Sequence, residues 1–492
     1  IQLIKESLKG FSSIPAIEPQ LDLTQDSKFG DLSTNIAMRL SKDLKQPPRD
    51  IAVKLIDNIN TQAKNLGLKD YIKEIKVEGA GFINFYLSEK YLYQELEDIL
   101  LKEKAALAVD LGKGKRVLIE FVSANPTGSL SVAHARQAAV GDALASILEF
   151  LGFKVSKEYY LNDEGNQINT LGKSTELRIK ELAGEKIEFP ENYYQGEYIY
   201  DIAKIAIKEG IKTEDLGNFA ADYILSIIKK ELDDFGVKFD CWYSQKELGK
   251  SGKIEKAFDY LKKKGLLYES EGALWFKSTD FLDDKDRVVV KSDGSQTYLA
   301  PDIAYHDDKY KRGFEWLINI WGPDHHGYIN RLKSSVAAFG RDPDSLSILI
   351  VQLATIFRDG KPVQMSTRRG EYITLREVLD EVGRDASRFF FMARRTSSHL
   401  DFDLDIAKAQ TAQNPVYYVQ YAYARINSIL RNSVVKLDKH TDLALLKEKE
   451  ELALIKKLLQ FSYILNICLS TQDPYMLTVY LQEVAESFHK FY

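Results

Sequence analysis

A loop of small and polar residues, EFVSANPTGSLSVAHAR at 120–136, is the first segment whose residue types could do chemistry. A long helical pattern follows this loop, so His134 falls on the first turn of the expected helix. A helix N-terminus offers free N–H groups and the positive end of the helix dipole, and an imidazole can donate to a phosphate oxygen. The segment therefore predicts a triphosphate site, and the plainer alternative is a helix cap with one incidental histidine.

A second segment, PVQMSTRRGEYITL at 362–375, is short, basic and rich in hydroxyl groups. Its Arg368 and Arg369 could neutralise the charge that develops on a pyrophosphate leaving group. An isolated segment of this kind is more often a solvated basic turn. Only its pairing with the first loop favours the phosphate interpretation.

The elements that must position these loops form a doubly wound parallel sheet. The short apolar run RVLIEFVSA, the loop and the helix place the loop at the carboxyl end of a buried strand, where such sheets bind ligands. Strand patterns at RVVVKS, FEWLINIWG and SILIVQL are expected to supply the second half of this sheet. Amphipathic helical patterns over about 170–270 are expected to form an insertion between the two halves.

The 492 residues suggest about three domains, at roughly 150 residues each. Residues 1–108 predict an α+β domain, with KEIKVEGAGFINFYL as a strand pair, and residues 109–400 predict the Rossmann-type α/β domain with its insertion. Residues 401–492 are nearly all helical in pattern. The fold class is thus α/β multidomain, with an α+β domain before the parallel sheet and an all-α domain after it.

Composition bounds the class of protein. Hydrophobic residues make up 45% and charged residues 28%, which is typical of globular chains, and the net charge of -5 neither requires nor excludes a local nucleic-acid surface. Cys241 and Cys468 cannot form a disulfide framework or a four-thiolate zinc site, which favours a reducing cytosol. No apolar run in the sequence approaches the ~20 residues of a membrane span, and the residues from Ile1 onward do not form a signal peptide, so we expect a cytoplasmic protein without a membrane partner. Because the chain starts at Ile1 rather than Met, we expect its true start to be missing.

Together the two loops resemble the paired HIGH and KMSK signatures of class I aminoacyl-tRNA synthetases. The sequence around them resembles that of the arginyl-tRNA synthetases. The resemblance covers essentially the whole chain. It is carried by SANPTG, YLNDEGNQI (160–168), YLAPDIAYHDDKY (298–310), WGPDHHGY (321–328), DGKPVQMSTRRGE (359–371), SHLDFDLDIAK (398–408), NPVYYVQYAYARI (414–426) and, near the N-terminus, KFGDLSTNIAM and GAGFINFYL.

The resemblance implies that ATP activates L-arginine to arginyl-adenylate, which is then transferred to the terminal ribose of tRNA(Arg). ATP would come with Mg²⁺, no structural metal is expected, and the enzyme would be a monomer that binds tRNA before it activates arginine. The N-terminal and C-terminal domains would bind the tRNA, the latter through its anticodon stem and loop. Since family members continue beyond FHKFY, the last helices of the anticodon domain are expected to be missing.

The resemblance also assigns residues to the ATP site. The HIGH-like residues are Ala124, Asn125, Pro126, Thr127, Gly128, Ser129, Leu130, Ser131, Val132, Ala133 and His134. The KMSK-like residues are Met365, Ser366, Thr367, Arg368 and Arg369. By the same resemblance, Asp324 and His326 would lie near the nucleotide. Taken by itself the tripeptide DHH is typical of a metal site, but the sequence shows no clear third ligand.

A pocket for arginine needs a carboxylate and planar acceptors, because the guanidinium is planar and permanently charged. By resemblance the pocket residues are Glu120, Asn125, Tyr298, Asp302 and Gln245. Asp302 could equally cap a helix after Pro301, and an Asn in an NP turn is by default only a turn residue.

Five positions depart from the family's pattern. Ser131 and Ala133 replace the first histidine and the glycine of HIGH, Gln364 and Thr367 replace the lysines of KMSK, and Gln245 replaces a frequent glutamate. We hypothesise that Ser131 donates in place of the imidazole and that an arginine of the basic loop neutralises the pyrophosphate.

These departures keep three alternatives open. The chain could be a tRNA-binding protein derived from a synthetase and no longer catalytic, although the other expected site residues are present. Another class I synthetase is disfavoured by Asp302 and by the N-terminal domain, and a small-molecule nucleotidyltransferase would not need two flanking RNA-binding domains.

Aromatic residues are the candidates for RNA contacts outside the active site. Base stacking could use one or two of four tyrosines, the rest being core: Tyr417, Tyr418, Tyr421 and Tyr423. In the N-terminal domain the candidates for packing against the tRNA elbow are Phe29, Asn35, Phe82 and Asn84.

Overall fold

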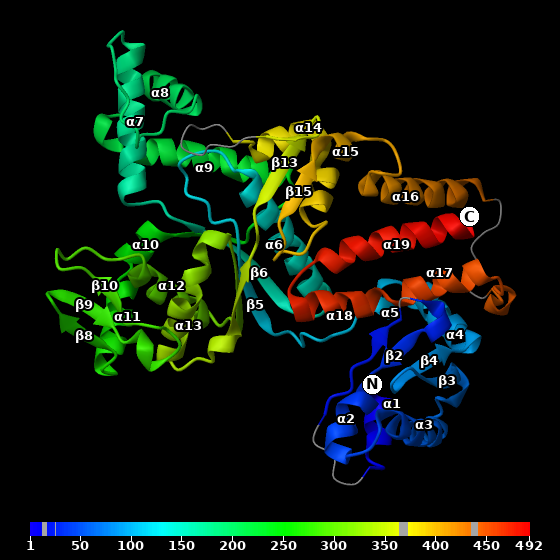
Figure 1. The fold of residues 1–492 in the computed structure, drawn as a ribbon. Helices are drawn as coiled ribbons and strands as arrows, with labels where there is room; N and C mark the ends of the chain where they lie inside the picture. The colour runs from blue at the N-terminus through cyan, green and yellow to red at the C-terminus, as the bar shows by residue number, and fades with distance from the viewer. Residues whose placement is uncertain (12–16, 25, 364–371, 434–440) are drawn as a thin grey trace. The chain divides into compact units, whose positions relative to one another are not determined.

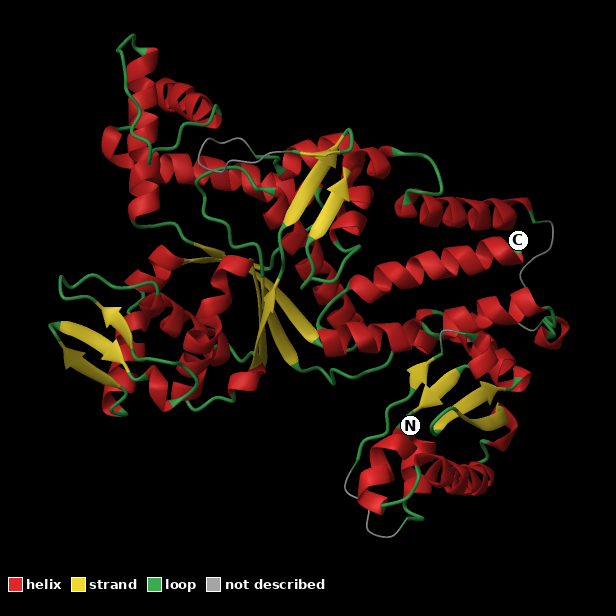
Figure 2. Ribbon diagram, in the orientation of Figure 1, coloured by secondary structure: helices red, strands yellow, loops and turns green. Residues whose placement is uncertain are grey.

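The computed structural model describes residues 1–11, 17–24, 26–363, 372–433 and 441–492. The chain forms two compact units. One comprises Ile1–Leu107, Arg431–Phe461 and Glu486–Tyr492, and the other comprises Ala108–Leu430 and Ser462–Ala485. Each unit has its own core, and the expected N-terminal α+β domain, parallel-sheet domain and helical C-terminal region are all present (Figures 1 and 2).

The first unit contains a four-stranded antiparallel sheet in the order β1-β2-β4-β3. Its strands are β1 (Asp22–Leu23), β2 (Leu32–Thr34), β3 (Ile72–Glu78) and β4 (Phe82–Leu87), and its helices are α1 (Gln2–Leu8), α2 (Ile36–Leu44), α3 (Pro48–Asn65), α4 (Glu89–Lys102), α5 (Lys104–Leu107) and α17 (Lys449–Leu459). The strand pair expected around Gly79 and Gly81 is confirmed as β3 and β4. Gly81 has φ +130° and lies so close to Pro48 that a Cβ would meet it at 2.9 Å, which excludes a side chain there.

Of the elbow candidates in this unit, the aromatic pair is exposed and the asparagines are less so. Phe29 and Phe82 are exposed, whereas Asn84 is buried and accepts from Ser33 Oγ at 2.6 Å. Asn35 is half-buried before α2. Asn84 therefore holds neighbouring strands together rather than facing solvent.

The second unit is built on a five-stranded, wholly parallel sheet in the order β12-β11-β5-β6-β7. The strands are β5 (Arg116–Glu120), β6 (Lys154–Leu161), β7 (Cys241–Ser244), β11 (Trp316–Trp321) and β12 (Leu346–Ile350). The apolar runs at 116–120, 316–321 and 346–350 are thus confirmed as neighbouring strands of one sheet. This confirms the predicted doubly wound arrangement.

Helices make up much of the rest of this unit. They are α6 (Val132–Phe150), α7 (Asn166–Leu182), α8 (Tyr198–Glu209), α9 (Leu216–Asp234), α10 (Gln245–Lys250), α11 (Lys253–Lys263), α12 (Leu299–Lys311), α13 (Ile329–Ala338), α14 (Leu375–Phe391) and α15 (Leu404–Lys408). α6 follows β5 directly and lies in the main core, with nearly every residue from Ala135 to Ala145 buried, because it connects two adjacent buried strands.

The expectation for RVVVKS was wrong. Residues Arg287–Val290 form β10, which belongs to a separate antiparallel sheet of order β10-β9-β8, with β8 (Leu267–Ser270) and β9 (Ala273–Phe276). Val289 is buried in a different core, with residues of α11 and α12. A four-residue apolar run carries no signal of which sheet it joins, and the local meander supplies its nearest partner. The central sheet instead takes in β7, a short strand inside the stretch 170–270 that was expected to be helical.

A third small sheet and the C-terminal helices complete the chain. β13 (Ala354–Arg358) pairs with β14 (Lys361–Pro362) and with β15 (Leu400–Asp403). The C-terminal region is helical, as expected, with α16 (Pro415–Asn432), α17, α18 (Phe461–Thr471) and α19 (Tyr475–Phe491). On α16, Tyr421 and Tyr423 are exposed, while Tyr417 and Tyr418 are half-buried.

The sequence was expected to contain no apolar run as long as a membrane span, and one helical stretch differs from this expectation. Among the described residues, Lys449–Thr471 is a single stretch that is long and apolar enough to cross a membrane. Length and composition are weak evidence, because core helices meet the same criteria. Lys456 in this stretch forms an ion pair of 2.6 Å with Asp31.

Candidate active site

The loops after β5 and β11 open at the same edge of the parallel sheet. β5 lies between β11 and β6, and the chain leaves β5 toward β6 while β11 leads on to β12 on the other side. A parallel sheet binds ligands outside the carboxyl ends of the strands at such a switch of direction. The predicted phosphate loop at 121–131 and the segment Pro323–Tyr328 therefore share one crevice.

The backbone is strained where it leaves β5. Val122 has φ +68° and Ser123 has φ +41°, a left-handed conformation that is costly for a β-branched residue such as Val122. Two hydrogen bonds of the Ser123 side chain stabilise this backbone conformation. Ser123 Oγ donates to Glu120 at 3.2 Å and accepts from the Tyr160 N–H at 3.1 Å. Such strain commonly accompanies a loop shaped for a ligand.

His134 is held as a neutral donor at the start of α6. Its Nδ1 lies 3.2 Å from the Ser131 backbone N–H and 3.1 Å from the Ser131 hydroxyl. Because Nδ1 accepts from that N–H, the ring proton is on Nε2, which remains available to a ligand. Burial lowers the pKa of His134 to about 4, so the ring is uncharged at neutral pH. Ser131 therefore orients the histidine in this structure.

A cavity of about 260 Å³ lies over the HIGH-like loop. It brings together most of the HIGH-like residues with a group of residues from the segment between α7 and α8 and the start of α8, and with Tyr372, which precedes α14. Its lining is Ala124, Asn125, Thr127, Gly128, Ser129, Ser131, His134, Tyr194, Gln195, Gly196, Tyr198 and Tyr372. Of the HIGH-like residues outside this lining, Pro126, Leu130 and Val132 are buried and Ala133 is half-buried.

Asp302 lies on the first turn of α12, and its side chain is half-buried. Tyr328 donates to its Oδ2 at 2.7 Å. Burial is the main reason that the pKa of Asp302 is raised to about 7. The hydrogen bond from Tyr328 lowers this pKa, the negative charge of Glu120 raises it, and the positive charge of Lys309 lowers it. The carboxyl is therefore poised to bind a cation, because a positive ligand would restore its ionised form.

A chain of hydrogen bonds joins Asp302 to Glu120 through buried residues. His306 Nδ1 lies 2.8 Å from the Asp302 backbone oxygen, and Asn319 Nδ2 lies 2.9 Å from His306 Nε2. Lys309 Nζ donates to Asn319 Oδ1 at 3.2 Å and to Glu120 Oε2 at 2.6 Å. Burial, and secondly Lys309, hold the pKa of His306 well below its usual value, so its ring is neutral. The carboxyl group of Glu120 and the backbone of Asp302 are thus joined by one set of buried side chains.

Gln245 and Asn125 are each held by hydrogen bonds to residues of β6 or of the segment that follows it. Tyr160 donates to Gln245 Oε1 at 3.0 Å, and Gln245 Nε2 donates to Glu164 at 3.1 Å. Asn125 Nδ2 donates to Gln167 at 2.7 Å. Burial, and then the neighbouring charges of Asp302 and Glu120, raise the pKa of Tyr160, so its hydroxyl stays protonated and can donate to Gln245.

The other predicted site residues are exposed to solvent or lie outside the described residues. Tyr298 precedes α12 with 74% of its surface exposed, so its ring does not enclose Asp302 in this structure. Asp324 and His326 are exposed on the short 3₁₀ segment after β11. The described residues contain no group of three or more potential metal ligands. The KMSK-like residues Met365–Arg369 lie outside the described residues.

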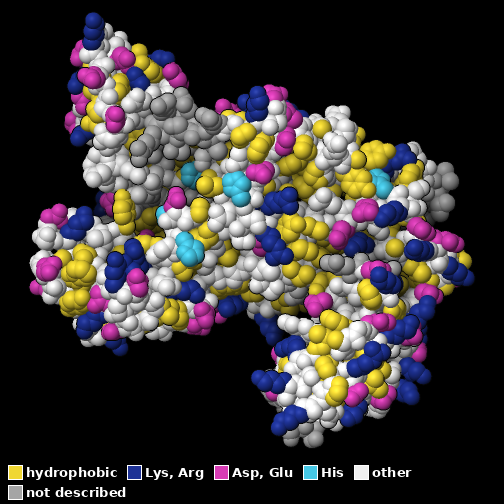
Figure 3. Space-filling model, in the orientation of Figure 1, with side chains coloured by type: hydrophobic (Ala, Val, Ile, Leu, Met, Phe, Trp, Pro, Cys, Tyr) yellow, Lys and Arg dark blue, Asp and Glu magenta, His cyan; other side chains and the backbone are white. Residues whose placement is uncertain are grey.

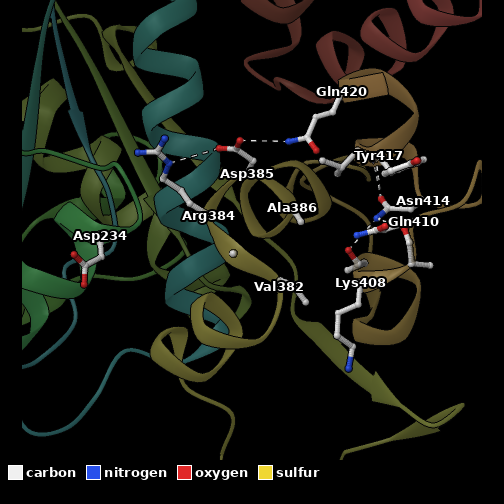
Figure 4. A pocket seen from close by; sticks show the side chains of 14 residues that line it. Asp234, Val382, Arg384, Asp385, Ala386, Lys408, Gln410, Asn414, Tyr417 and Gln420 are labelled. Atoms are coloured by element: carbon white, nitrogen blue, oxygen red, sulfur yellow. Dashed lines mark hydrogen bonds and ion pairs between the residues drawn. The ribbon is translucent and has the colours of Figure 1, made fainter. Parts of the chain in front are cut away.

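A separate cavity of about 600 Å³ lies at a kink in α14, where Gly383 has φ +78° (Figure 4). None of the residues predicted for the ATP and arginine sites lines it, whereas Tyr417, one of the four tyrosines considered for base stacking, does. Figure 4 shows Arg384 beside Asp385, which in turn faces Gln420. Its charged residues are already paired, in Arg384–Asp385, Lys408–Glu381 and Asp234–Arg376.

Sequence reasoning assigned no role to several residues that shape the crevice. Tyr160, Lys309 and Tyr328 stand inside segments that were already recognised as similar to the family, so a family motif was the available signal. The sequence contained no signal for Tyr198 or Tyr372, because nothing in their local sequence indicates contact with the loop at 127–129. Charged groups of both signs are interspersed on the face in Figure 3, in keeping with the small net charge.

Family models match nearly the whole chain. Residues 95–430 match the class I (R) tRNA synthetase catalytic domain, residues 1–87 match the arginyl-tRNA synthetase N-terminal domain, and residues 419–492 match the DALR anticodon-binding domain. Together with the parallel sheet and its crevice, these matches define a class I aminoacyl-tRNA synthetase, an ATP-using ligase.

Individual relatives narrow the class. Arginine–tRNA ligases of Geobacter sp. (strain M21) and Citrifermentans bemidjiense are each 49% identical to this chain, over 97% of it and 88% of their own length. The structure of Thermus thermophilus arginyl-tRNA synthetase aligns with all of this chain and 90% of its own, at 22% identity and a TM-score of 0.78, which shows the same fold. The chain belongs to the arginyl-tRNA synthetase family.

Proposed function

We propose that the chain catalyses the reaction of ATP, L-arginine and tRNA(Arg) to L-arginyl-tRNA(Arg), AMP and diphosphate. The observation that carries the proposal is the position of Asp302, a poised carboxyl in the crevice that also holds the HIGH-like loop. A cationic amino acid and a nucleotide would meet there.

Asp302 binds the arginine guanidinium in this proposal. Its partner Tyr328 holds the carboxylate in place, and Tyr298 closes over the side chain when it leaves its exposed position. Asn125 binds the α-amino group, with Glu120 close by, and Gln245 is held beside the substrate by Tyr160. Lysine and citrulline would leave buried polar groups unpaired, which can discriminate by ~10⁴ or more without editing.

In the first step an oxygen of the arginine carboxylate attacks the α-phosphorus of Mg²⁺-bound ATP, and the bond to pyrophosphate breaks. The neutral His134 donates from Nε2 to a phosphate oxygen, next to free N–H groups at the start of α6. Arg368 or Arg369 neutralises the leaving pyrophosphate, with Met365, Ser366 and Thr367 in the same loop. Asp324 and His326 contact the nucleotide from the loop after β11.

In the second step a hydroxyl of the terminal tRNA ribose attacks the carbonyl carbon of arginyl-adenylate, and AMP leaves. The tRNA is held by the regions that flank the parallel-sheet domain, within the proposed boundaries 1–108, 109–400 and 401–492. Tyr421 and Tyr423 are the exposed tyrosines of α16 available for stacking. We further propose that the enzyme acts in the cytoplasm as a monomer, without a membrane partner, and that tRNA must bind before arginine is activated.

Arginine-dependent ATP–pyrophosphate exchange, with and without tRNA(Arg), tests this function. Exchange only with tRNA supports both the activity and the requirement for tRNA. Exchange without tRNA keeps the activity and removes the requirement. Absence of exchange in both, from folded protein that still binds tRNA(Arg), would overturn the catalytic proposal in favour of a tRNA-binding role.

A further inference from the structure

Two tyrosine hydroxyls hold the backbone of the HIGH-like loop. Tyr198 donates to the backbone oxygen of Thr127 at 2.6 Å, and Tyr372 donates to that of Ser129 at 2.9 Å. Residues 127–129 lie in a turn outside any helix or strand, so these bonds supply restraint that regular structure does not.

Gly128 lies between the two hydroxyls. A Cβ at this position would meet the Tyr372 hydroxyl at 3.3 Å and the Tyr198 hydroxyl at 3.4 Å. The φ of Gly128 lies outside the left-handed range, so alanine is permitted by the backbone there. The two hydroxyls, and not the local conformation, are what make this position tight.

Tyr198 reaches the loop from the helical insertion. It is the first residue of α8, and its ring lies over Gly196, where a Cβ would meet the ring at 2.5 Å. A side chain at Gly196 would displace the ring and, with it, the hydroxyl. The sequence QGEY thus permits a contact between the insertion and the loop.

Tyr372 reaches the loop from the segment that precedes α14. That segment is paired with the HIGH-like segment through the backbone as well: Leu375 N–H donates to Leu130 O at 2.7 Å, and Val132 N–H donates to Ile373 O at 3.3 Å. Burial, and then the charge of Glu231, raise the pKa of Tyr372, so the hydroxyl stays protonated and can donate. The chain on either side of Gly128 is therefore tied both to the insertion and to residues just after the basic loop.

We propose that Tyr198 and Tyr372 are positioning residues that set the backbone at 127–129 for ATP. They do so as a pair, one from the insertion and one from the start of the α14 region, and neither reacts with substrate. This inference rests on the proposed role of the HIGH-like loop in ATP binding.

The first test removes each hydroxyl in the full chain. Tyr198→Phe and Tyr372→Phe should each raise the Kd for ATP, measured by calorimetry, by about three- to tenfold, as expected for the loss of one hydrogen bond. The KM for ATP in pyrophosphate exchange should rise in parallel, while the KM for arginine stays within twofold. Tyr200→Phe is the matched control, since Tyr200 lies on the same helix and its hydroxyl bonds to Glu181 and Arg178 away from the loop; this variant should behave as wild type.

The second test uses Gly128 to separate positioning from general stability. Gly128→Ala should weaken ATP binding about fivefold or more in the wild-type background and less than twofold when both tyrosines are phenylalanine, because the obstructing hydroxyls are gone. A general loss of stability would not produce this relief, and melting temperatures report it separately.

Unchanged Kd and KM for ATP in both phenylalanine variants, or an equal effect of Gly128→Ala in both backgrounds, would overturn the inference. Failure of the proposed function looks different: the wild type then shows no exchange in the presence of tRNA. The ATP titrations still decide the role of the two tyrosines in that case, and a wild type that does not bind ATP overturns both proposals.

Discussion

Lys309 Nζ lies 2.6 Å from Glu120 Oε2, with the lysine side chain wholly buried. Glu120 ends β5 and Lys309 is on α12, so this ion pair joins the central strand to the helix that carries Asp302. A buried pair of this kind contributes little net stability over apolar packing, but it is costly to break because the remaining charge is left unpaired. Lys309 also lowers the pKa of Asp302, so the charge of this lysine acts on both carboxyl groups of the proposed arginine pocket.

Lys309→Met should therefore impair both folding and arginine binding. We expect a loss of about 3–5 kcal/mol in the free energy of unfolding. The KM for arginine should also change more than the KM for ATP. Urea unfolding and exchange kinetics measure the two effects, and Lys311→Met, at an exposed lysine of the same helix, is the control. If the free energy of unfolding of Lys309→Met equals that of the wild type, the role assigned to the ion pair is contradicted.

Arginine binding should depend on pH through Asp302. Its pKa is raised to about 7, mainly by burial, and the guanidinium binds the ionised form. The Kd for arginine should therefore increase as pH falls below 7, approaching about tenfold per pH unit, and should level off above it. Calorimetry at pH 6.0 to 8.5, in buffers of different ionisation enthalpy, should also show proton release on binding near neutral pH. A flat profile would mean that Asp302 is already ionised.

Asp302→Asn should separate stability from function. A carboxyl whose pKa is raised on folding destabilises the folded state progressively as pH rises from its unfolded pKa to its folded pKa. The amide avoids this cost, so the ligand-free variant should melt at a higher temperature than wild type at pH 8, and the difference should shrink toward pH 5. Arginine-dependent exchange should be lost. Melting of the variant below wild type at pH 8 would argue against the assigned shift.

His134 should act without titrating in the working range. Because burial lowers its pKa to about 4, exchange between pH 6 and 8 should show no inflection from this residue. His134→Ala should lower kcat by about 10²–10³-fold, as for other lost oxyanion donors, and Ser131→Ala by about fivefold through loss of one orienting bond. Equal and small effects of both substitutions would indicate that the imidazole is only a helix cap.

The two arginines of the basic loop can be tested separately. If either neutralises the leaving pyrophosphate, Arg368→Ala or Arg369→Ala should lower kcat by about 10²–10³-fold with the melting temperature unchanged. Pre-steady-state release of pyrophosphate measures this step directly. Wild-type kcat in both variants would contradict the assignment.

The sequence by itself determined the class of the sheet and the identity of the loops that lie at its edge. Apolar runs flanked by turns predicted β5, β11 and β12, because strands buried on both faces need continuous apolar side chains. The same local signal misplaced β10 and missed β7, because strand pairing is decided by contacts between segments that are distant in the chain.

Only the tertiary structure decided how the site residues are held. The sequence indicated Asp302, Glu120 and His134 through motifs, whose spacing is local. It gave no sign that Lys309 neutralises Glu120 across 189 positions, or that Tyr372 bonds to Ser129 across 243. These bonds depend on the approach of whole helices and strands, and that approach follows from the packing of the core and not from any local pattern.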